Sequence, residues 1–266
     1  MYTKQHLIDC LIKIGIKPTD TLLVHSSMKA IGQVDGGADT VLDAFIEYLK
    51  DDGLLIFPTH TWKQMSEEYN IFNPKTEPSC VGILTNLFLK RPGVIRSLHP
   101  THSVAALGKD ALEYTSGEEH FDTPCSRNGC WGKLYDRKAK ILFIGCTMIR
   151  NTYIHGVEEW SNIPNRLMDK HRLLKIISPD EGIIDRPMRS HYFPNGNVSY
   201  NYDKLLEPFL YHKVARRGKI GDAKSILCDA VGAAEVTTNF LQKNPRLFDD
   251  SNPIPKDWYQ GDLIIN

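Results

Sequence analysis

The sequence predicts an α/β sandwich, in which strands and helices alternate along the chain. Short runs of consecutive apolar residues, the pattern of strands that are buried on both faces, recur in the first part of the chain. Between them lie segments whose apolar residues return every three or four positions, as on one face of a helix. This alternation of strand and helix patterns is typical of α/β proteins.

The N-terminal segment predicts a helix followed by a strand. Thr3 can cap a helix whose apolar residues between Leu7 and Ile14 form one face, and Gly15 supplies its end. Residues 21–24 are a short apolar run, consistent with a buried strand.

The next elements repeat this order. A loop that contains glycine, at residues 32–37, leads to a second amphipathic helix over residues 41–49. A second strand at residues 54–57 is closed by Pro58. The predicted order is therefore helix, strand, helix, strand.

The middle of the chain predicts a long loop, a helix and two more strands. Residues 60–80 are rich in proline, asparagine and aromatic residues, and loops of such length are often functional. Residues 81–90 resemble a helix. Residues 103–108 and 139–145 resemble buried strands, and we expect the helix that carries His155 to follow the second of them.

Beyond Pro164 the pattern loosens into polar segments with several prolines, until a helical run covers residues 229–241. No repeat, low-complexity tract or composition shift marks a linker. We expect one domain over residues 1–266. The part from about residue 165 to 266 is expected to complete the substrate side of a functional site, the side that binds the acceptor.

The composition excludes several classes of protein. The 32 basic and 32 acidic residues leave no net charge, and the densest basic run, Arg216–Lys219, is too short for a phosphate-tracking surface. No run reaches the ~18 apolar residues of a membrane span, and the N-terminus has no signal-peptide pattern. The six cysteines form no CxxC motif. We expect a cytoplasmic protein with reduced thiols that binds neither nucleic acid nor membrane.

The most informative segment is residues 151–160, where His155 is followed three and four positions later by Glu158 and Glu159. On a helix these offsets lie on one side, so an imidazole and a carboxylate can share a pocket. An imidazole oriented by a carboxylate can accept a proton near neutral pH. The alternative is an amphipathic helix with a solvated Glu pair and a core histidine.

A second candidate segment is His25-Ser26-Ser27, at the carboxyl end of the first predicted strand. Open α/β sheets bind ligands at such ends, and a loop that leads into a helix N-terminus suits an anion. The segment is neither GxGxxG nor a Walker loop, so neither a dinucleotide nor nucleotide hydrolysis is favoured. The alternative is a tight turn with capping serines.

Histidines gather at the predicted strand ends. If these ends share one edge of the sheet, four histidines line a single cleft: His25, His60, His99 and His155. A metal site is the rival interpretation, because imidazole is a common zinc ligand, but no HExxH, HxH or Cys/His pair gives the usual spacing. We therefore expect no metal.

A mechanism with a covalent intermediate on a serine or cysteine of the protein is less favoured than direct transfer of a group between two bound ligands. The GxSxG elbow of serine hydrolases is absent. A cysteine nucleophile is conceivable at Cys125 or Cys130, yet nothing in the sequence indicates a lowered thiol pKa.

Taken together, these residues resemble the aminoglycoside 3-N-acetyltransferase family, also called the antibiotic N-acetyltransferase family. The likeness covers most of the chain. It is carried by Leu23–Gly32 with Gly36-Gly37, Phe57-Pro58-Thr59, His99-Pro100 with Ser103, Gly132-Lys133-Leu134, and Asn151-Thr152 with His155 and Glu158. A weaker match covers residues 218–223 and 227–230.

The resemblance implies acetyl-CoA-dependent N-acetylation of an amino sugar. It also implies a three-layer α/β/α sandwich with a mixed, largely parallel central sheet, distinct from the GNAT acetyltransferases. His155 would be the general base and Glu158 part of its acidic pocket. The residues expected to bind the cofactor are His25, Ser26, Ser27, Met28, His99, Ser103 and Lys133. Those expected to bind the acceptor are Thr59, Trp62, Glu159 and Asp222.

The chain departs from the family pattern at two places. Ser126–Trp131 replaces a Gly-x-x-Ser-Pro pattern before Gly132-Lys133-Leu134, and residues 62–78 lack the acidic loop of resistance enzymes. An acyltransferase for an endogenous amino sugar and a non-catalytic CoA-binding protein therefore stay open as alternatives. A homodimer is a further expectation.

Overall fold

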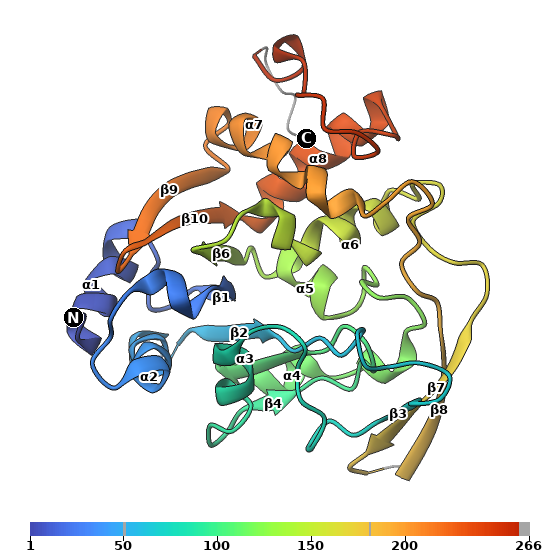
Figure 1. Ribbon diagram of the computed structural model, residues 1–266, viewed down its shortest axis with the longest axis horizontal. Helices are drawn as coiled ribbons and strands as arrows, with labels where there is room; N and C mark the ends of the chain where they lie inside the picture. The colour runs from blue at the N-terminus through green and yellow to red at the C-terminus, as the bar shows by residue number, and fades with distance from the viewer. Residues whose placement is uncertain (50–51, 181, 261–266) are drawn as a thin grey trace.

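A seven-stranded mixed sheet runs through the middle of the molecule, in the order β4-β5-β2-β1-β6-β10-β9 (Figure 1). The computed structural model describes residues 1–49, 52–180 and 182–260. The strands of this sheet are β1 (Thr21–Ser26), β2 (Leu54–Pro58), β4 (Ile95–Arg96), β5 (Val104–Gly108), β6 (Lys140–Ile144), β9 (Ala215–Ile220) and β10 (Ala223–Asp229).

Parallel pairing is confined to the centre of this sheet, where β2 and β6 flank β1. The other four pairings of the described sheet are antiparallel. The sheet is mixed, as expected, but the expectation of a largely parallel pairing is wrong for its flanks. For one of these pairings the reason is local: β9 and β10 are joined by the two-residue turn Gly221-Asp222, and strands joined by so short a turn must run antiparallel.

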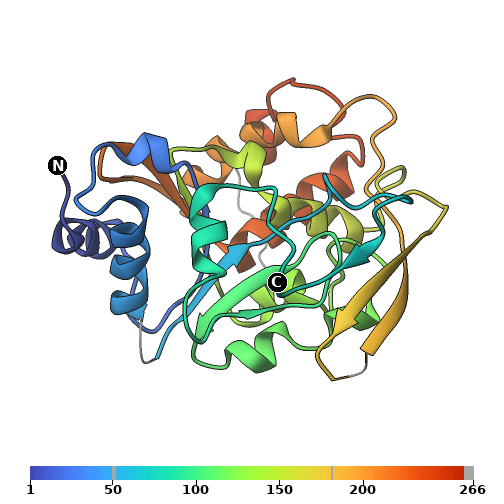
Figure 2. The same ribbon diagram turned by 60° about the horizontal axis from the view of Figure 1, so that its bottom comes forward.

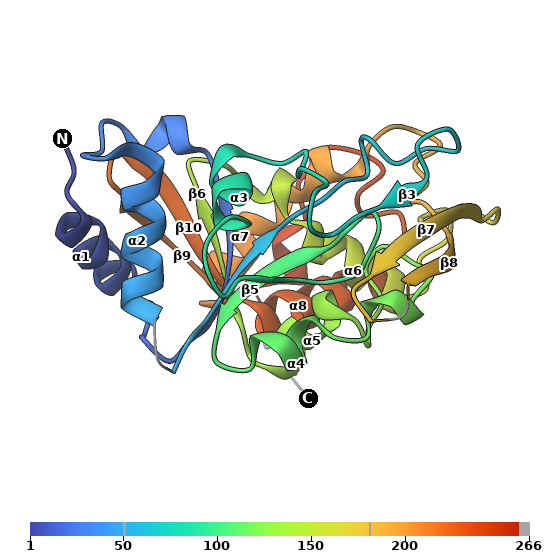
Figure 3. The ribbon, with the colours of Figure 1, turned by 90° about the horizontal axis from the view of Figure 1, so that it is seen from below.

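Helices cover both faces of the sheet, which confirms the three-layer sandwich (Figure 3). One face carries α1 (Lys4–Ile14), α2 (Gly37–Leu49) and α3 (Ile83–Phe88). The other carries α4 (Ala111–Thr115), α5 (Cys130–Asp136), α6 (Thr152–Trp160), α7 (Leu206–Tyr211) and α8 (Ala230–Lys243). Successive residues of a strand serve opposite faces: Leu22 and Val24 pack with α1 and α2, and Leu23 packs with α5 and α6.

The predicted N-terminal helix is confirmed at both ends. The Thr3 side chain accepts a hydrogen bond from the backbone N–H of His6, and Gly15 adopts the left-handed conformation, with φ 91°, that ends the helix. The following strand is longer than expected, because β1 includes His25 and Ser26. Five 3₁₀ segments complete the described elements: η1 (Met28–Ile31), η2 (Glu118–His120), η3 (Met148–Arg150), η4 (Val198–Leu205) and η5 (Lys256–Trp258).

A second, three-stranded sheet stands at one end of the molecule (Figure 2). It consists of β3 (Ile71–Phe72), β7 (Arg172–Ser178) and β8 (Gly182–Met188). The sequence predicted a long loop over residues 60–80 and no regular element between Pro164 and residue 229. The strand pattern of these segments is weak, because β7 buries Leu174 and Ile176 but leaves Leu173 and Ile177 exposed. A run that is apolar on both faces, in a segment with prolines, does not show its period.

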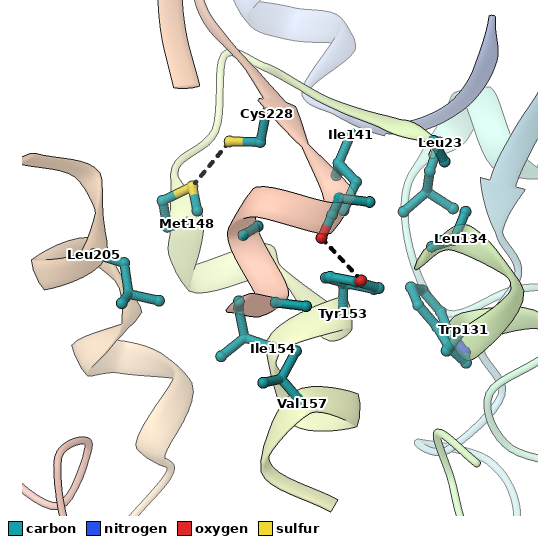
Figure 4. Close-up of a cluster of buried hydrophobic side chains, with 14 of the residues drawn as sticks. Leu23, Trp131, Leu134, Ile141, Met148, Tyr153, Ile154, Val157, Leu205 and Cys228 are labelled. Carbon is teal, nitrogen blue, oxygen red and sulfur yellow. Dashed lines mark hydrogen bonds between the residues drawn. The ribbon is translucent and has the colours of Figure 1, made fainter. Parts of the chain in front are cut away.

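A dense core fixes α6 against the sheet (Figure 4). Ile154 and Val157 are fully buried, and the hydroxyl of Tyr153 donates a hydrogen bond to the carbonyl of Ala230 at 3.0 Å. Burial of a large apolar side chain stabilises the fold by about 1.5–3 kcal/mol, so this helix has little freedom to move. None of the helices that the structure describes combines the length and the apolar character needed to cross a bilayer.

Candidate active site

The candidate site lies at the carboxyl edge of the three central strands. β1, β2 and β6 are parallel, so their carboxyl ends meet at one edge, and the antiparallel β5 brings residues 99–103 to the same edge. Gly145, directly after β6, has φ 61°, and a Cβ there would lie 2.2 Å from the Cβ of Ala30. Only glycine permits this close approach of the end of β6 to η1.

His155 belongs to a three-residue group with Glu158 and Tyr202. Its Nδ1 lies 2.7 Å from the Tyr202 hydroxyl and 3.5 Å from Oε2 of Glu158. The same hydroxyl donates its single proton to Oε2 of Glu158. The hydroxyl oxygen must therefore accept a proton from Nδ1, which leaves Nε2 of His155 with a free lone pair.

The carboxylate of Glu158 is fully buried but charged. Burial alone would raise its pKa, but the hydrogen bond and charge of His155, together with Arg166 and Tyr202, outweigh burial and lower the pKa. Arg166 donates to Oε1 of Glu158 and forms a second ion pair with Asp249 at 2.9 Å. Arg166 thus supplies the charge partner that a buried carboxylate needs.

His155 is uncharged at neutral pH. Burial is the main cause that lowers its pKa to about 4, the charge of His191 lowers it further, and Glu158 opposes both. A neutral imidazole with a free Nε2 is the form that a general base requires.

A second carboxylate–histidine pair lies beside the first. Nε2 of His191 is 3.1 Å from Oε1 of Glu159, and that oxygen also accepts the backbone N–H of Cys125 at 3.0 Å. The rings of His191 and His155 are 4.5 Å apart, and Phe193 packs 5.3 Å from His155.

The other histidines extend this group toward β2 and β5. His102 lies 5.0 Å from His191, 4.9 Å from His60 and 5.9 Å from His99 between ring centres. His60 also contacts the hydroxyl of Thr152 at 3.1 Å. The expected convergence of His60, His99 and His155 is therefore confirmed by this chain of contacts.

His25 lies at the end of β1, close enough to His60 for their charges to interact. It stacks on Phe143 at 5.1 Å, and its buried Nε2 has no hydrogen-bond partner among the described residues. Burial, with a smaller effect of the Arg150 charge, lowers its pKa to about 3.

Several residues expected to bind ligands are already engaged within the protein. Nδ1 of His99 accepts the backbone N–H groups of Thr101 and His102, and Nε2 contacts the carbonyl of Thr123 at 3.0 Å. Neither ring nitrogen is left for a cofactor, so His99 is a structural histidine that joins two loops.

Thr59 and Ser103 form a buried hydrogen-bonded network below the site. Their hydroxyls lie 2.8 Å apart, and Arg96 donates to both at 3.2 Å. Both residues are fully buried. Their hydroxyls therefore support the loop conformations at the strand ends and are closed off from an acceptor or a cofactor.

Lys133 and Asp222 lie apart from the His155 group. Nζ of Lys133 donates to three carbonyls at the end of α4 and so caps that helix. Asp222 accepts the hydroxyl of Tyr2 and packs against Gly32, on the side of α1. The remaining expected residues lie at the edge: Ser26, Ser27 and Met28 are half-buried beside β6, and Trp62 is exposed.

Five residues of the site were not predicted from the sequence. They all come from the C-terminal half of the chain: Arg166, His191, Phe193, Tyr202 and Asp249. Four of them contact His155, Glu158 or Glu159, and Asp249 pairs with Arg166. These contacts arise only through tertiary packing, so no local spacing marks the residues. Trp131 also lies at the site and belongs to the segment that departs from the family pattern. Its ring stacks on His60 at 5.5 Å, and its Nε1 donates a hydrogen bond to the carbonyl of His102.

The cysteines show no sign of nucleophilic activation. Cys125 and Cys130 are fully buried, and burial raises the pKa of both thiols well above the usual value. Cys125, Glu159 and His191 place possible ligand atoms within 4.8 Å of one another. The hydrogen bonds of Glu159 to the other two residues account for this grouping.

This fold and site define a class of protein. A buried carboxylate beside a neutral imidazole, at the carboxyl edge of an α/β sheet, is an arrangement that can accept a proton from a bound ligand. The chain belongs to the aminoglycoside 3-N-acetyltransferase family, whose model matches residues 23–242. This membership places it among the N-acetyltransferases and confirms the resemblance seen in the sequence.

Known proteins with similar sequences carry related names. The chain is 28% identical over 270 residues to aminoglycoside N(3)-acetyltransferase III of a Salmonella species, covering 92% of this chain and 93% of that one. It is 30% identical to the aminoglycoside N(3')-acetyltransferase-like protein YokD of Bacillus subtilis, over 59% of this chain. That match spans 64% of YokD, so the chain matches less than two thirds of the relative's length.

Solved structures confirm the fold. AAC-IIIb in a binary complex with CoASH superimposes with a TM-score of 0.80 at 22% identity, covering 91% of this chain and 97% of that one. AAC-VIa bound to sisomicin gives a TM-score of 0.79 at 21% identity, covering 91% of this chain and 98% of that one.

Proposed function

We propose that the chain transfers the acetyl group of acetyl-CoA to an amino group of an aminoglycoside or related amino sugar, with His155 as general base. The observation that carries this proposal is the Glu158–Tyr202–His155 group, which leaves Nε2 of the imidazole unprotonated and partly exposed. Membership of an N-acetyltransferase family supports the reaction type.

The reaction is a direct transfer. Nε2 of His155 takes a proton from the acceptor ammonium, and the free amine attacks the thioester carbon. Glu158, through the Tyr202 hydroxyl, balances the charge that the imidazolium acquires. When the C–S bond breaks, the imidazolium returns its proton to the leaving sulfur, and the second proton of the attacking nitrogen leaves for solvent. Backbone amides or hydroxyls at the strand ends stabilise the oxyanion.

Acetyl-CoA would lie along the end of β1. His25 has a buried Nε2 without a partner among the described residues, and Ser26 and Ser27 are half-buried beside it, so this segment retains polar groups for a ligand. His99, Ser103 and Lys133 instead direct their polar groups to partners within the protein. The CoA complex of AAC-IIIb, a protein of the same fold, supports this co-substrate.

The C-terminal part of the chain would complete the acceptor side. A cavity of about 280 Å³ lies beside Phe193, the residue that packs on His155. All its lining residues come from the part beyond residue 163: Pro164, Asn165, Arg166, Phe193, Pro194, Asn195, Gly196, Val198, Pro245, Arg246 and Asp249. The sisomicin complex of AAC-VIa, a protein of the same fold, supports an amino-sugar acceptor.

One observation favours the second candidate acceptor, an endogenous amino sugar with few positive charges. The two carboxylates closest to the base, Glu158 and Glu159, are bound to Arg166 and His191. A polycationic drug needs unpaired carboxylates to replace its hydration, whereas a singly charged amine does not.

The test is an assay of free CoA release by the purified protein. A panel of aminoglycosides and nucleotide-linked amino sugars is offered with acetyl-CoA, and the rate is compared with that of each amine alone. Release with a member of the panel supports the proposal and identifies the acceptor class. If CoA binds but no amine causes release, the protein is a non-catalytic CoA-binding homologue.

We also propose the homodimer and the cytoplasmic location expected from the sequence. Sedimentation equilibrium of the purified protein tests the first, and fractionation of the producing cells tests the second.

A further inference from the structure

The Glu159–His191 pair repeats the chemistry of the Glu158–His155 pair beside it. Oε1 of Glu159 accepts both the backbone N–H of Cys125 and a hydrogen bond from Nε2 of His191. Because a carboxylate only accepts, Nε2 of His191 must carry a proton, and in the neutral imidazole the lone pair is then on Nδ1. Glu159 thus orients its histidine as Glu158 orients His155.

Both rings open toward accessible space. The side chains of His155 and His191 are 13% and 11% exposed, whereas His25, His60, His99 and His102 are buried. Nε2 of His155 and Nδ1 of His191 have no hydrogen-bond partner among the described residues. Neither atom is fully buried away from solvent. The ring centres lie 4.5 Å apart and the ring planes are inclined by 32°, so the two imidazoles are direct neighbours.

The proposed acetyl transfer requires two proton removals from one nitrogen. The ammonium must lose a proton before it can attack, and the nitrogen of the tetrahedral adduct must lose a second before the amide forms. One proton leaves with the sulfur of CoA and the other goes to solvent. A single imidazole that holds the first proton for the sulfur cannot accept the second.

We propose that His191 is a second catalytic base, whose Nδ1 takes the second proton from the attacking nitrogen. This inference rests on the proposed acetyl transfer. His155 removes the ammonium proton, the amine forms its bond to the thioester carbon, and His191 takes a proton from the resulting cationic nitrogen. The carbonyl re-forms as the C–S bond breaks, His155 protonates the sulfur, and His191 releases its proton to solvent.

The electrostatics of the pair support this order of events. A positive charge on His191 lowers the pKa of His155, so proton uptake by His191 makes the His155 imidazolium a better acid toward the leaving sulfur. Two neighbouring imidazolium ions would repel each other, but each has its own carboxylate, Glu158 or Glu159, on α6. The two adjacent carboxylates of α6 thus supply one counter-charge for each ring.

The experiment compares His191→Asn, His191→Gln and His191→Ala with the wild type, using the amine found active in the CoA-release panel. Asparagine keeps an acceptor near the position of Nδ1 and glutamine keeps a donor toward Glu159, but neither is a base. We expect all three to lower kcat by about 10²–10³-fold, the range of general acid–base catalysis, with KM for both substrates within about threefold. Added imidazole should restore part of kcat in His191→Ala.

The matched control is His171→Gln, which removes a histidine from another carboxylate pair. Nε2 of His171 lies 2.8 Å from Asp122, and its side chain is 43% exposed. This variant should keep kcat and KM. Glu159→Gln keeps the hydrogen bonds to His191 and Cys125 but removes the counter-charge, so it should fold and lose about tenfold in kcat.

Two results overturn the inference. One is kcat within about threefold of the wild type for both His191→Asn and His191→Gln. The other is a lower kcat that imidazole does not restore in a folded His191→Ala and that Glu159→Gln does not share, because His191 is then structural. If the wild type releases no CoA with any amine, the proposed function itself fails. Loss of activity in His155→Ala with normal His191 variants rejects only this inference.

Discussion

Two neighbouring carboxylates of helix α6, Glu158 and Glu159, lie in two regions of the site and have different binding partners. On the side of η4, Glu158 is sealed from solvent and bound by Arg166 and Tyr202 as well as by His155. On the side of the 121–125 loop, the carboxylate of Glu159 accepts hydrogen bonds from two described groups, the backbone N–H of Cys125 and the ring of His191. A carboxylate at this site can therefore be held by a cation or by the backbone, with different consequences for stability.

The most severe test of this contrast is His155→Ala. It removes the only base that we assign to the ammonium proton, so kcat should fall by about 10³–10⁴-fold. KM for acetyl-CoA should stay close to that of the wild type, because His25 and its neighbours are unchanged. Initial rates of CoA release with saturating acetyl-CoA measure both quantities. Near-normal turnover would show that His155 is not the base.

Arg166→Ala tests the η4 side. It leaves the buried charge of Glu158 without its cation, and such a loss lowers the free energy of unfolding by about 3–5 kcal/mol. The matched control is Arg246→Ala: this exposed arginine pairs with Asp249, and its loss should cost less than about 1 kcal/mol. Urea denaturation measures both. Equal effects of the two substitutions contradict the special role of Arg166.

Acidification should destabilise the whole group of histidines. The folded-state pKa values of His25, His99 and His155 are lowered from 6.5 to about 3, about 4 and about 4. Between pH 6.5 and 4 the unfolded chain therefore binds protons that the folded protein does not, and stability falls as the pH falls through this window. Thermal unfolding at a series of pH values should show this decrease in Tm. A constant Tm from about pH 7 to 4 would mean that the buried imidazoles are not neutral.

Tyr202→Phe isolates a single hydroxyl on the η4 side. The change keeps the ring but removes the link between Glu158 and His155, so we expect kcat to fall by about 10–100-fold and stability by about 1–3 kcal/mol. Tyr153→Phe is the control, because its buried hydroxyl bonds to the carbonyl of Ala230, away from the carboxylates. It should lose similar stability but keep kcat. A similar loss of kcat in both variants would rule out the specific role of Tyr202.

Lys133→Met should have the smallest effect. The ammonium of Lys133 caps α4, so its loss should lower stability by about 1 kcal/mol and leave KM for acetyl-CoA unchanged. Binding of acetyl-CoA measured by calorimetry decides between this role and the one that the family resemblance implied. A tenfold weaker affinity would restore Lys133 to the cofactor site.

The parts of the site that depend on local spacing could be predicted from the sequence. The offset between His155 and Glu158 is a helical offset, and the gathering of strand ends follows from parallel pairing. Tyr202 and His191 could not be predicted, because they approach α6 from distant loops. His99 and Ser103 were expected at the cofactor, whereas their hydrogen bonds in the structure are to groups of the protein. A residue that supports a loop beside the site can recur in a family motif as readily as one that touches the ligand.

The fold shows the same division. The buried strands and the capped helix α1 follow from short-range patterns, whereas β7 and β8 do not, because their outward faces carry Leu173, Ile177 and Ile183 in place of polar residues. The antiparallel flank of β9 and β10 was missed because neither had been recognised as a strand, and that of β5 because a buried apolar run does not show the direction of its pairing. Long-range pairing and exposed apolar faces are thus what local patterns do not reveal.

The ion pair between Arg166 and Asp249 has a consequence for synthesis of the protein. Asp249 lies in the loop after α8, so the ribosome adds it long after α6 has emerged. Until then Arg166 has no second anchor to hold it against Glu158. A polypeptide truncated before this aspartate would keep His155, Glu158 and Tyr202 yet lack the ion pair that braces Arg166 against the buried carboxylate.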